Sequence, residues 1–139
     1  GIIAKALGGR AAELVFLGPE AVTSGAGSDL VHATSVARRM VAEFGMSEEV
    51  GLVSADPSAQ NGAPSAQLQG EIDTAVRALI GHQASRAEAI VREHAVALDA
   101  IARALVDRGV LMASEVLAIA ADQGVPLQQS IERTELVEA

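Results

Sequence analysis

The chain has 139 residues, half of them hydrophobic, and a net charge of −8 from 18 acidic and 10 basic residues. The acidic balance and the lack of a basic patch predict that nucleic acid is not a partner. Cysteine is absent, which excludes disulfides and thiolate metal sites, and no apolar run approaches the roughly 20 residues of a membrane-spanning helix. We therefore expect this chain itself to be soluble.

Alanine is the commonest residue, and the aromatic residues are two phenylalanines only. Alanine favours helix more than any other residue, and its small side chain lets backbones approach closely. The composition predicts an all-α fold with a thin, tightly packed core. We expect a helical bundle of about four to five helices.

The first helix is predicted from Ile2 to about Leu17, with one apolar face. Gly8 and Gly9 in its middle each cost about 1 kcal/mol relative to alanine. Such a cost is usually offset when another group passes close to the backbone at the glycine. Gly18, followed by proline, is expected to end the helix.

A loop of small residues, 21–28, leads to a second predicted helix. Ser28 is expected to cap this helix, and Asp29 in its first turn suits the helix dipole. Gly45 is placed as its left-handed terminator. Residues 46 to about 64 predict a long connection. The apolar face of the helix is predicted to consist of Leu30, Ala33, Ala37, Met40, Val41 and Phe44.

The longest periodic stretch begins at Ser65 or Ala66 and closes at Arg108–Gly109. It is either one very long helix or two helices joined near Gly81 or His94, and we favour a bent antiparallel pair broken near His94. A short helix from Ser114 to about Gln123 follows, with Ser114 as its cap, and the tail to Ala139 is expected to fray. We divide the chain into residues 1–64 and 65–139, within one structural domain overall.

Few residues suggest chemistry by themselves. Asp29 ends a glycine-hinged loop, which could deliver a carboxylate to a fixed point, but an ordinary first-turn acid is the commoner explanation. His32 lies three residues later on the same side of the helix, so the two could share a metal, although a solvated face is more usual. His82 and His94 fit no zinc spacing. The sequence contains no His-Glu-x-x-His motif.

Three consecutive segments nevertheless resemble one family, the FtsH-type ATP-dependent zinc metalloproteases. Residues 8–13 read Gly-Gly-Arg-Ala-Ala-Glu, and residues 18–30 read Gly-Pro-Glu-Ala-Val-Thr-Ser-Gly-Ala-Gly-Ser-Asp-Leu. Residues 33–47 read Ala-Thr-Ser-Val-Ala-Arg-Arg-Met-Val-Ala-Glu-Phe-Gly-Met-Ser. All three match the family's pattern in register. The half of the chain that follows resembles the family's C-terminal helical bundle more loosely.

The resemblance implies roles for four residues. In the family, zinc is bound by the two histidines of His-Glu-x-x-His and by the aspartate that matches Asp29, so Asp29 becomes the third zinc ligand. Glu13 becomes a candidate for orienting a ligand histidine. Thr23 and Gly25 become loop residues that set the position of the carboxylate.

The resemblance also implies what this sequence lacks. The segment with His-Glu-x-x-His should precede Gly1, and the AAA+ ATPase module and the membrane anchor are also missing. Two positions depart from the family: Leu14 replaces a glutamate, and Ser28 replaces the usual asparagine. With no catalytic residue of its own and one ligand of three, this chain alone is expected to be inactive and to hold no zinc.

The parent protein is then expected to be a membrane-anchored homo-hexamer. Its ATPase feeds unfolded polypeptide to the zinc on the cytoplasmic side of the bacterial inner membrane or an equivalent organelle membrane. The alternative is a non-catalytic helical adaptor or oligomerisation module derived from the same family.

Overall fold

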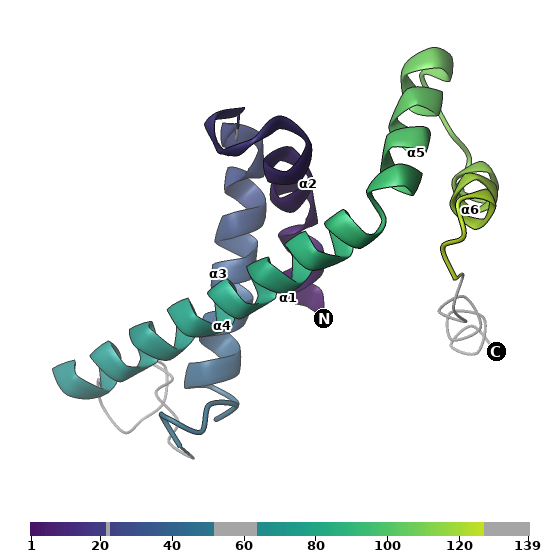
Figure 1. Cartoon of the computed structure of the whole chain (residues 1–139). Helices are drawn as coiled ribbons and strands as arrows, with labels where there is room; N and C mark the ends of the chain where they lie inside the picture. Colours follow the sequence, from purple (N-terminus) through teal and green to yellow (C-terminus); the bar gives the residue numbers. More distant parts are fainter. Residues whose placement is uncertain (22, 52–63, 127–139) are drawn as a thin grey trace. The chain divides into compact units, whose positions relative to one another are not determined.

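The computed structural model describes residues 1–21, 23–51 and 64–126. Every regular element in these ranges is helical: six α-helices and two short 3₁₀ helices, which confirms the all-α class (Figure 1). The chain separates into two units, Gly1–Val91 and a second that begins at Arg92. Each unit is described by itself, and the division at residue 64 within one structural domain stays a prediction.

The first predicted helix is two helices, α1 (Ile2–Ala6) and α2 (Gly8–Leu17). They are separated at Leu7, whose backbone has φ −84° and ψ −2°. The backbone N–H of Leu7 and of Ala11 still donates four residues back, at 3.1 and 3.0 Å, so the helical hydrogen bonding continues past the interruption. Gly18 ends α2 at φ +85°, as predicted. This interruption accounts for part of the difference between six helices and the four to five expected.

The loop after α2 contains the 3₁₀ helices η1 (Pro19–Ala21) and η2 (Ser24–Ala26), and it leads directly into α3 (Gly27–Ala42). The prediction that Ser28 caps this helix is wrong, because α3 begins one residue earlier. The preceding 3₁₀ helix η2 has a side-chain cap of its own: the hydroxyl of Thr23 accepts a hydrogen bond from the N–H of Gly25. Gly45 follows α3 with φ +61°, which confirms it as a left-handed residue after the helix.

The long periodic stretch forms α4 (Ala66–Glu93) and α5 (Ala95–Arg108). Ser65 caps α4, because its hydroxyl accepts from the N–H of Leu68 at 3.2 Å. The break falls at His94, as predicted, and the antiparallel arrangement of the two halves stays a prediction. Most of the predicted connection 46–64 lies outside the described residues.

Alanine is the commonest buried residue in the core of the first unit, as the composition predicted. Ala33 and Ala37 of α3 are completely buried, and the largest fully buried side chains are Val41 and Ile72. The prediction that Phe44 is part of the buried face is wrong: it lies beyond the end of α3 and is 54% exposed. Its ring lies 5.6 Å from the guanidinium carbon of Arg39, within cation–π range.

Helix α1 packs along α3 in the first unit. In Figure 1, α4 crosses both of these helices. Alanine at the buried positions of α3 permits this close approach, since no long side chain separates the backbones. Arg38 of α3 forms an ion pair with Asp73 of α4, and both side chains are about half exposed. Helix α3, whose first turn contains Asp29, therefore contacts both α1 and α4.

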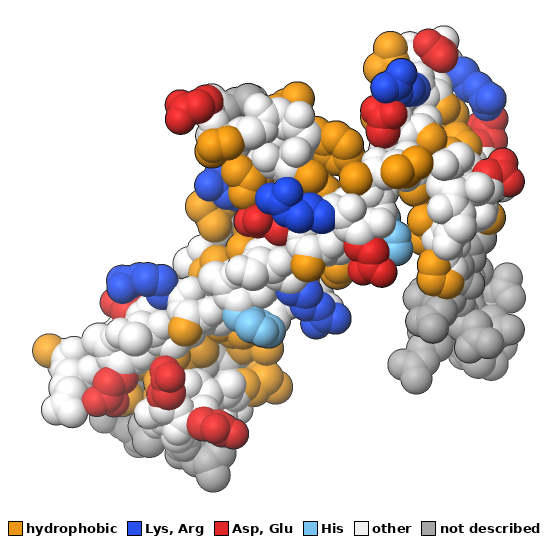
Figure 2. Space-filling view, in the orientation of Figure 1, with side chains coloured by type: hydrophobic (Ala, Val, Ile, Leu, Met, Phe, Trp, Pro, Cys, Tyr) orange, Lys and Arg blue, Asp and Glu red, His pale blue; other side chains and the backbone are white. Residues whose placement is uncertain are grey.

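The second unit consists of α5 and α6 (Ala113–Asp122), joined by a turn at Gly109 with φ +76°. The prediction that Ser114 caps α6 is wrong, because it lies inside the helix. Glu115 does lie in the first turn, where its carboxylate accepts from the N–H of Met112 at 2.8 Å and pairs with Arg108. Figure 2 shows hydrophobic side chains on the visible face of these helices. The predicted fraying of the tail concerns residues outside the described ranges. No helix among the described residues has the length and hydropathy to cross a membrane.

Candidate metal centre

The carboxylate of Asp29 lies on the surface where the loop meets the first turn of α3. A negative charge at this position interacts favourably with the positive end of the helix dipole. One carboxylate oxygen, Oδ2, approaches α2 at Gly9: it lies 3.9 Å from where a Cβ atom on Gly9 would be. The expectation that a group passes close to the backbone at the glycine pair is wrong at Gly8, whose Cβ would meet nothing within 4 Å. At Gly9 the approach of Asp29 is an ordinary van der Waals contact, which does not by itself require glycine.

The loop that precedes Asp29 is fastened to α2 by Glu13. Oε2 of Glu13 accepts a hydrogen bond from the N–H of Thr23, and Oε1 accepts from the Thr23 hydroxyl, both at 2.9 Å. The same hydroxyl accepts from the N–H of Gly25 at 3.2 Å. The structure therefore brings together three residues that the resemblance singled out. Their roles at a metal centre stay predictions.

These hydrogen bonds also affect the ionisation of Glu13. The backbone N–H of Thr23, then its hydroxyl, and more weakly the charge of Arg10 lower the pKa of Glu13 below its ordinary value of 4.5. All three favour the ionised carboxylate, which is the form that accepts both hydrogen bonds. The loop is consequently held most firmly when Glu13 is charged.

Gly25 sits in a narrow space. A Cβ atom at this position would lie 3.2 Å from the Thr23 hydroxyl oxygen, which is closer than ordinary van der Waals contact. A side chain here would press against the group that links Glu13 to η2. Glycine at residue 25 is therefore explained by the close approach of Thr23.

The described residues present one exposed carboxylate at this place and not a complete metal site. His32 lies one turn after Asp29 on α3 and is exposed. In the ranges that the structure describes, no three His, Cys, Asp or Glu side chains are grouped closely enough to hold a metal ion. A carboxylate oxygen is an ordinary zinc ligand, but protein zinc sites use three or four protein ligands. The residues present fit a contribution to a zinc site that other residues complete.

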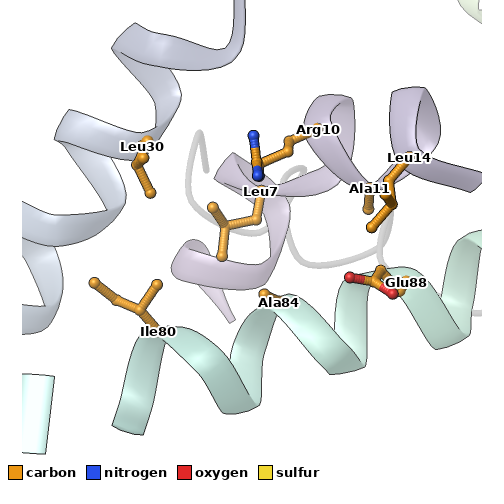
Figure 3. A pocket seen from close by; sticks show the side chains of 8 residues that line it. All are labelled: Leu7, Arg10, Ala11, Leu14, Leu30, Ile80, Ala84 and Glu88. Carbon is orange, nitrogen blue, oxygen red and sulfur yellow. The ribbon is translucent and has the colours of Figure 1, made fainter. Parts of the chain in front are cut away.

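A small cavity of about 90 Å³ lies next to the start of α3 (Figure 3). Its lining comes from Leu7, between α1 and α2, and from α2, α3 and α4, and it was not predicted from the sequence. Leu30, which directly follows Asp29, faces Ile80 of α4 across it, and Leu14 lines the α2 side. Leu14 is the residue that replaces a glutamate of the family pattern, and here it contributes apolar surface. The remaining lining residues are Arg10, Ala11, Ala84 and Glu88.

The first unit is a helical scaffold that presents one loop-borne carboxylate next to α2. The sequence model of peptidase family M41 matches residues 2–119. The chain belongs to this family, whose FtsH-type members are the zinc metalloproteases that its motifs resemble.

Several relatives are similar over most of the chain. The ATP-dependent zinc metalloprotease YME1 homolog of Schizosaccharomyces pombe is 40% identical over 109 residues, which is 78% of this chain and 15% of that protein. The chloroplastic ATP-dependent zinc metalloprotease FTSH 6 of Oryza sativa is 40% identical over 127 residues, or 84% of this chain and 18% of that protein. The ATP-dependent zinc metalloprotease FtsH of Neorickettsia risticii is 40% identical over 112 residues, or 79% and 18%. The chain thus spans less than a fifth of the length of these relatives.

Proposed function

We propose that this chain is the part of an ATP-dependent zinc metalloendopeptidase that supplies Asp29 as the third zinc ligand. The supporting observation is the placement of this carboxylate: it stands exposed at a loop–helix junction, beside Gly9, at the end of a loop that Glu13 ties to α2. The other two ligands and the general base come from a His-Glu-x-x-His segment, which this sequence does not contain. Bound zinc would activate a water molecule and polarise the scissile peptide carbonyl.

The isolated chain is proposed to be inactive and to hold no zinc. One carboxylate leaves most of the coordination shell to water, so the affinity conferred by several protein ligands is lost. Addition of His32 would still leave the site short of the usual ligand number. The chain therefore needs the rest of the peptidase domain as its first partner.

The proposal for the whole parent protein rests on its relatives, which are named ATP-dependent zinc metalloproteases. We propose that the parent carries an AAA+ ATPase module, that it assembles as a homo-hexamer, and that it degrades unfolded polypeptides. Its peptidase part would face the cytoplasmic side of the membrane that anchors it, or the equivalent side in an organelle.

The first experiment measures the zinc content of the protein as its gene encodes it, by elemental analysis, beside that of this chain. The test variant is Asp29→Asn, which keeps the size of the side chain but removes its charge. Asp107→Asn is the matched control, because Asp107 is an exposed aspartate of α5, in the second unit.

We expect zinc in the wild type and in the control, and a large loss of zinc and of proteolysis in Asp29→Asn with unchanged helical circular dichroism. Full zinc occupancy in Asp29→Asn would refute the ligand assignment. A wild-type gene product without zinc would favour the alternative, a helical adaptor or oligomerisation module that has lost its chemistry.

A further inference from the structure

One face of α2 meets both ends of the loop that delivers Asp29. Gly9 and Glu13 are four residues apart, so they lie one above the other on the same face of the helix. Glu13 binds Thr23 at the beginning of the loop, and Gly9 borders the carboxylate of Asp29 at its end. We refer to the pair Gly9 and Glu13 as the α2 platform.

We propose that the α2 platform positions the metal-ligating carboxylate: Glu13 fixes the start of the loop, and Gly9 keeps long side chains away from the surface of α2 that borders Asp29. The inference rests on the proposed function, because it takes Asp29 as a zinc ligand. In this proposal Gly9 has a positioning role that the sequence motif did not suggest. Glu13 acts on Asp29 indirectly, through its hydrogen bonds to Thr23. Both are positioning residues and need not contact the metal.

The link from Glu13 to Asp29 is short and continuous. Both oxygens of Glu13 accept hydrogen bonds from Thr23, which restrains the backbone and the side chain of that residue together. The hydroxyl of Thr23 then accepts from the N–H of Gly25 and caps η2. Since η2 runs directly into α3, the position of Thr23 restrains where the first turn of α3 begins.

The role of Gly9 follows from distance. At 3.9 Å from Oδ2 of Asp29, the methyl group of alanine would be in ordinary van der Waals contact with the carboxylate. A leucine at this position adds three carbon atoms beyond its Cβ, so in rotamers directed toward Asp29 it would displace the carboxylate. Gly8 is the matched control, since it belongs to the same helix and its Cβ would meet nothing within 4 Å.

The test measures the zinc dissociation constant of the gene-encoded protein by competition with a chromophoric chelator. Loss of a group that orients a ligand typically weakens metal binding by about 10- to 100-fold. We expect Gly9→Leu to weaken zinc binding by about that factor and Gly8→Leu to leave it unchanged, with similar melting temperatures for both. Gly9→Ala should remain closer to the wild type than Gly9→Leu.

The Glu13 arm of the platform is tested at Thr23. Thr23→Val keeps the shape of the side chain but loses the hydroxyl, so zinc binding should weaken. Thr23→Ser keeps the hydroxyl, so its zinc affinity should stay near that of the wild type. In this chain alone, Glu13→Gln should accelerate hydrogen exchange at the N–H groups of Thr23 and Gly25. This second readout needs no metal, and it applies even where a leucine variant does not fold.

The outcomes separate the two proposals. Equal losses of zinc in Gly8→Leu and Gly9→Leu would mean a general effect on the helix and would overturn the inference. Wild-type zinc affinity in both Gly9→Leu and Thr23→Val, with zinc lost in Asp29→Asn, would overturn the inference and leave the proposed function standing. Retention of zinc in Asp29→Asn would overturn both.

Discussion

Replacement of Ile72 by alanine tests whether the packing of α4 holds the first unit together. Ile72 is 1% exposed and is one of the two largest fully buried side chains among the described residues. The substitution removes three carbon groups, and at about 0.8 kcal/mol for each buried group the transfer term alone is about 2.4 kcal/mol. The cavity left behind adds to this, so the total loss should fall at about 3–4 kcal/mol, within the usual range for such changes.

Ile90→Ala is the matched control, because it makes the same substitution on the same helix at a side chain that is 45% exposed. About half of the transfer term then applies, and an open surface leaves no enclosed cavity, so we expect a loss of about 1 kcal/mol. The assay is urea denaturation of this chain followed by circular dichroism, with the free energy of unfolding from linear extrapolation. Equal losses for the two variants would refute the packing of α4 described above.

Three further predictions concern the loop, two glycines and an ion pair. The pKa of Glu13 is lowered in the folded chain, so its stabilising effect is complete above about pH 4.5 and is lost as the pH falls through the lower folded value. Hydrogen exchange at the N–H of Thr23 should therefore exceed the rate expected from its intrinsic pH dependence only in acid. Gly81 lies inside α4 with open space around it, so Gly81→Ala should stabilise the chain by about 0.5–1 kcal/mol. Gly109 has φ +76°, so Gly109→Ala should destabilise the chain by about 1 kcal/mol. Thermal unfolding measures both changes. Arg38→Ala removes a half-exposed ion pair and should cost less than about 1 kcal/mol in urea denaturation, with a smaller effect at high salt; a salt-independent cost of several kcal/mol would contradict that estimate.

The sequence by itself determined the fold class, the family and most of the helix ends. Alanine content and helical periodicity are local properties, so α4, the break at His94 and the terminators Gly18, Gly45 and Gly109 could be predicted without tertiary contacts. Glycine at a positive φ is a backbone requirement that the residue type itself reveals. The motifs were sufficient to identify the family, because their residues could be aligned with the family pattern without coordinates.

The tertiary structure decided which residues face one another. Nothing in the spacing shows that Gly9, and not Gly8, borders Asp29, or that both oxygens of Glu13 accept from Thr23, since these contacts join α2 to a loop with its own conformation. The helix starts predicted at Ser28 and Ser114 were wrong for a related reason: side-chain preference for a cap is weak compared with the backbone path that the neighbouring elements impose. Phe44 was misplaced because apolar periodicity continues beyond the point where α3 ends. Positions along a helix can be read from the chain, but contacts between elements depend on packing across sequence distance.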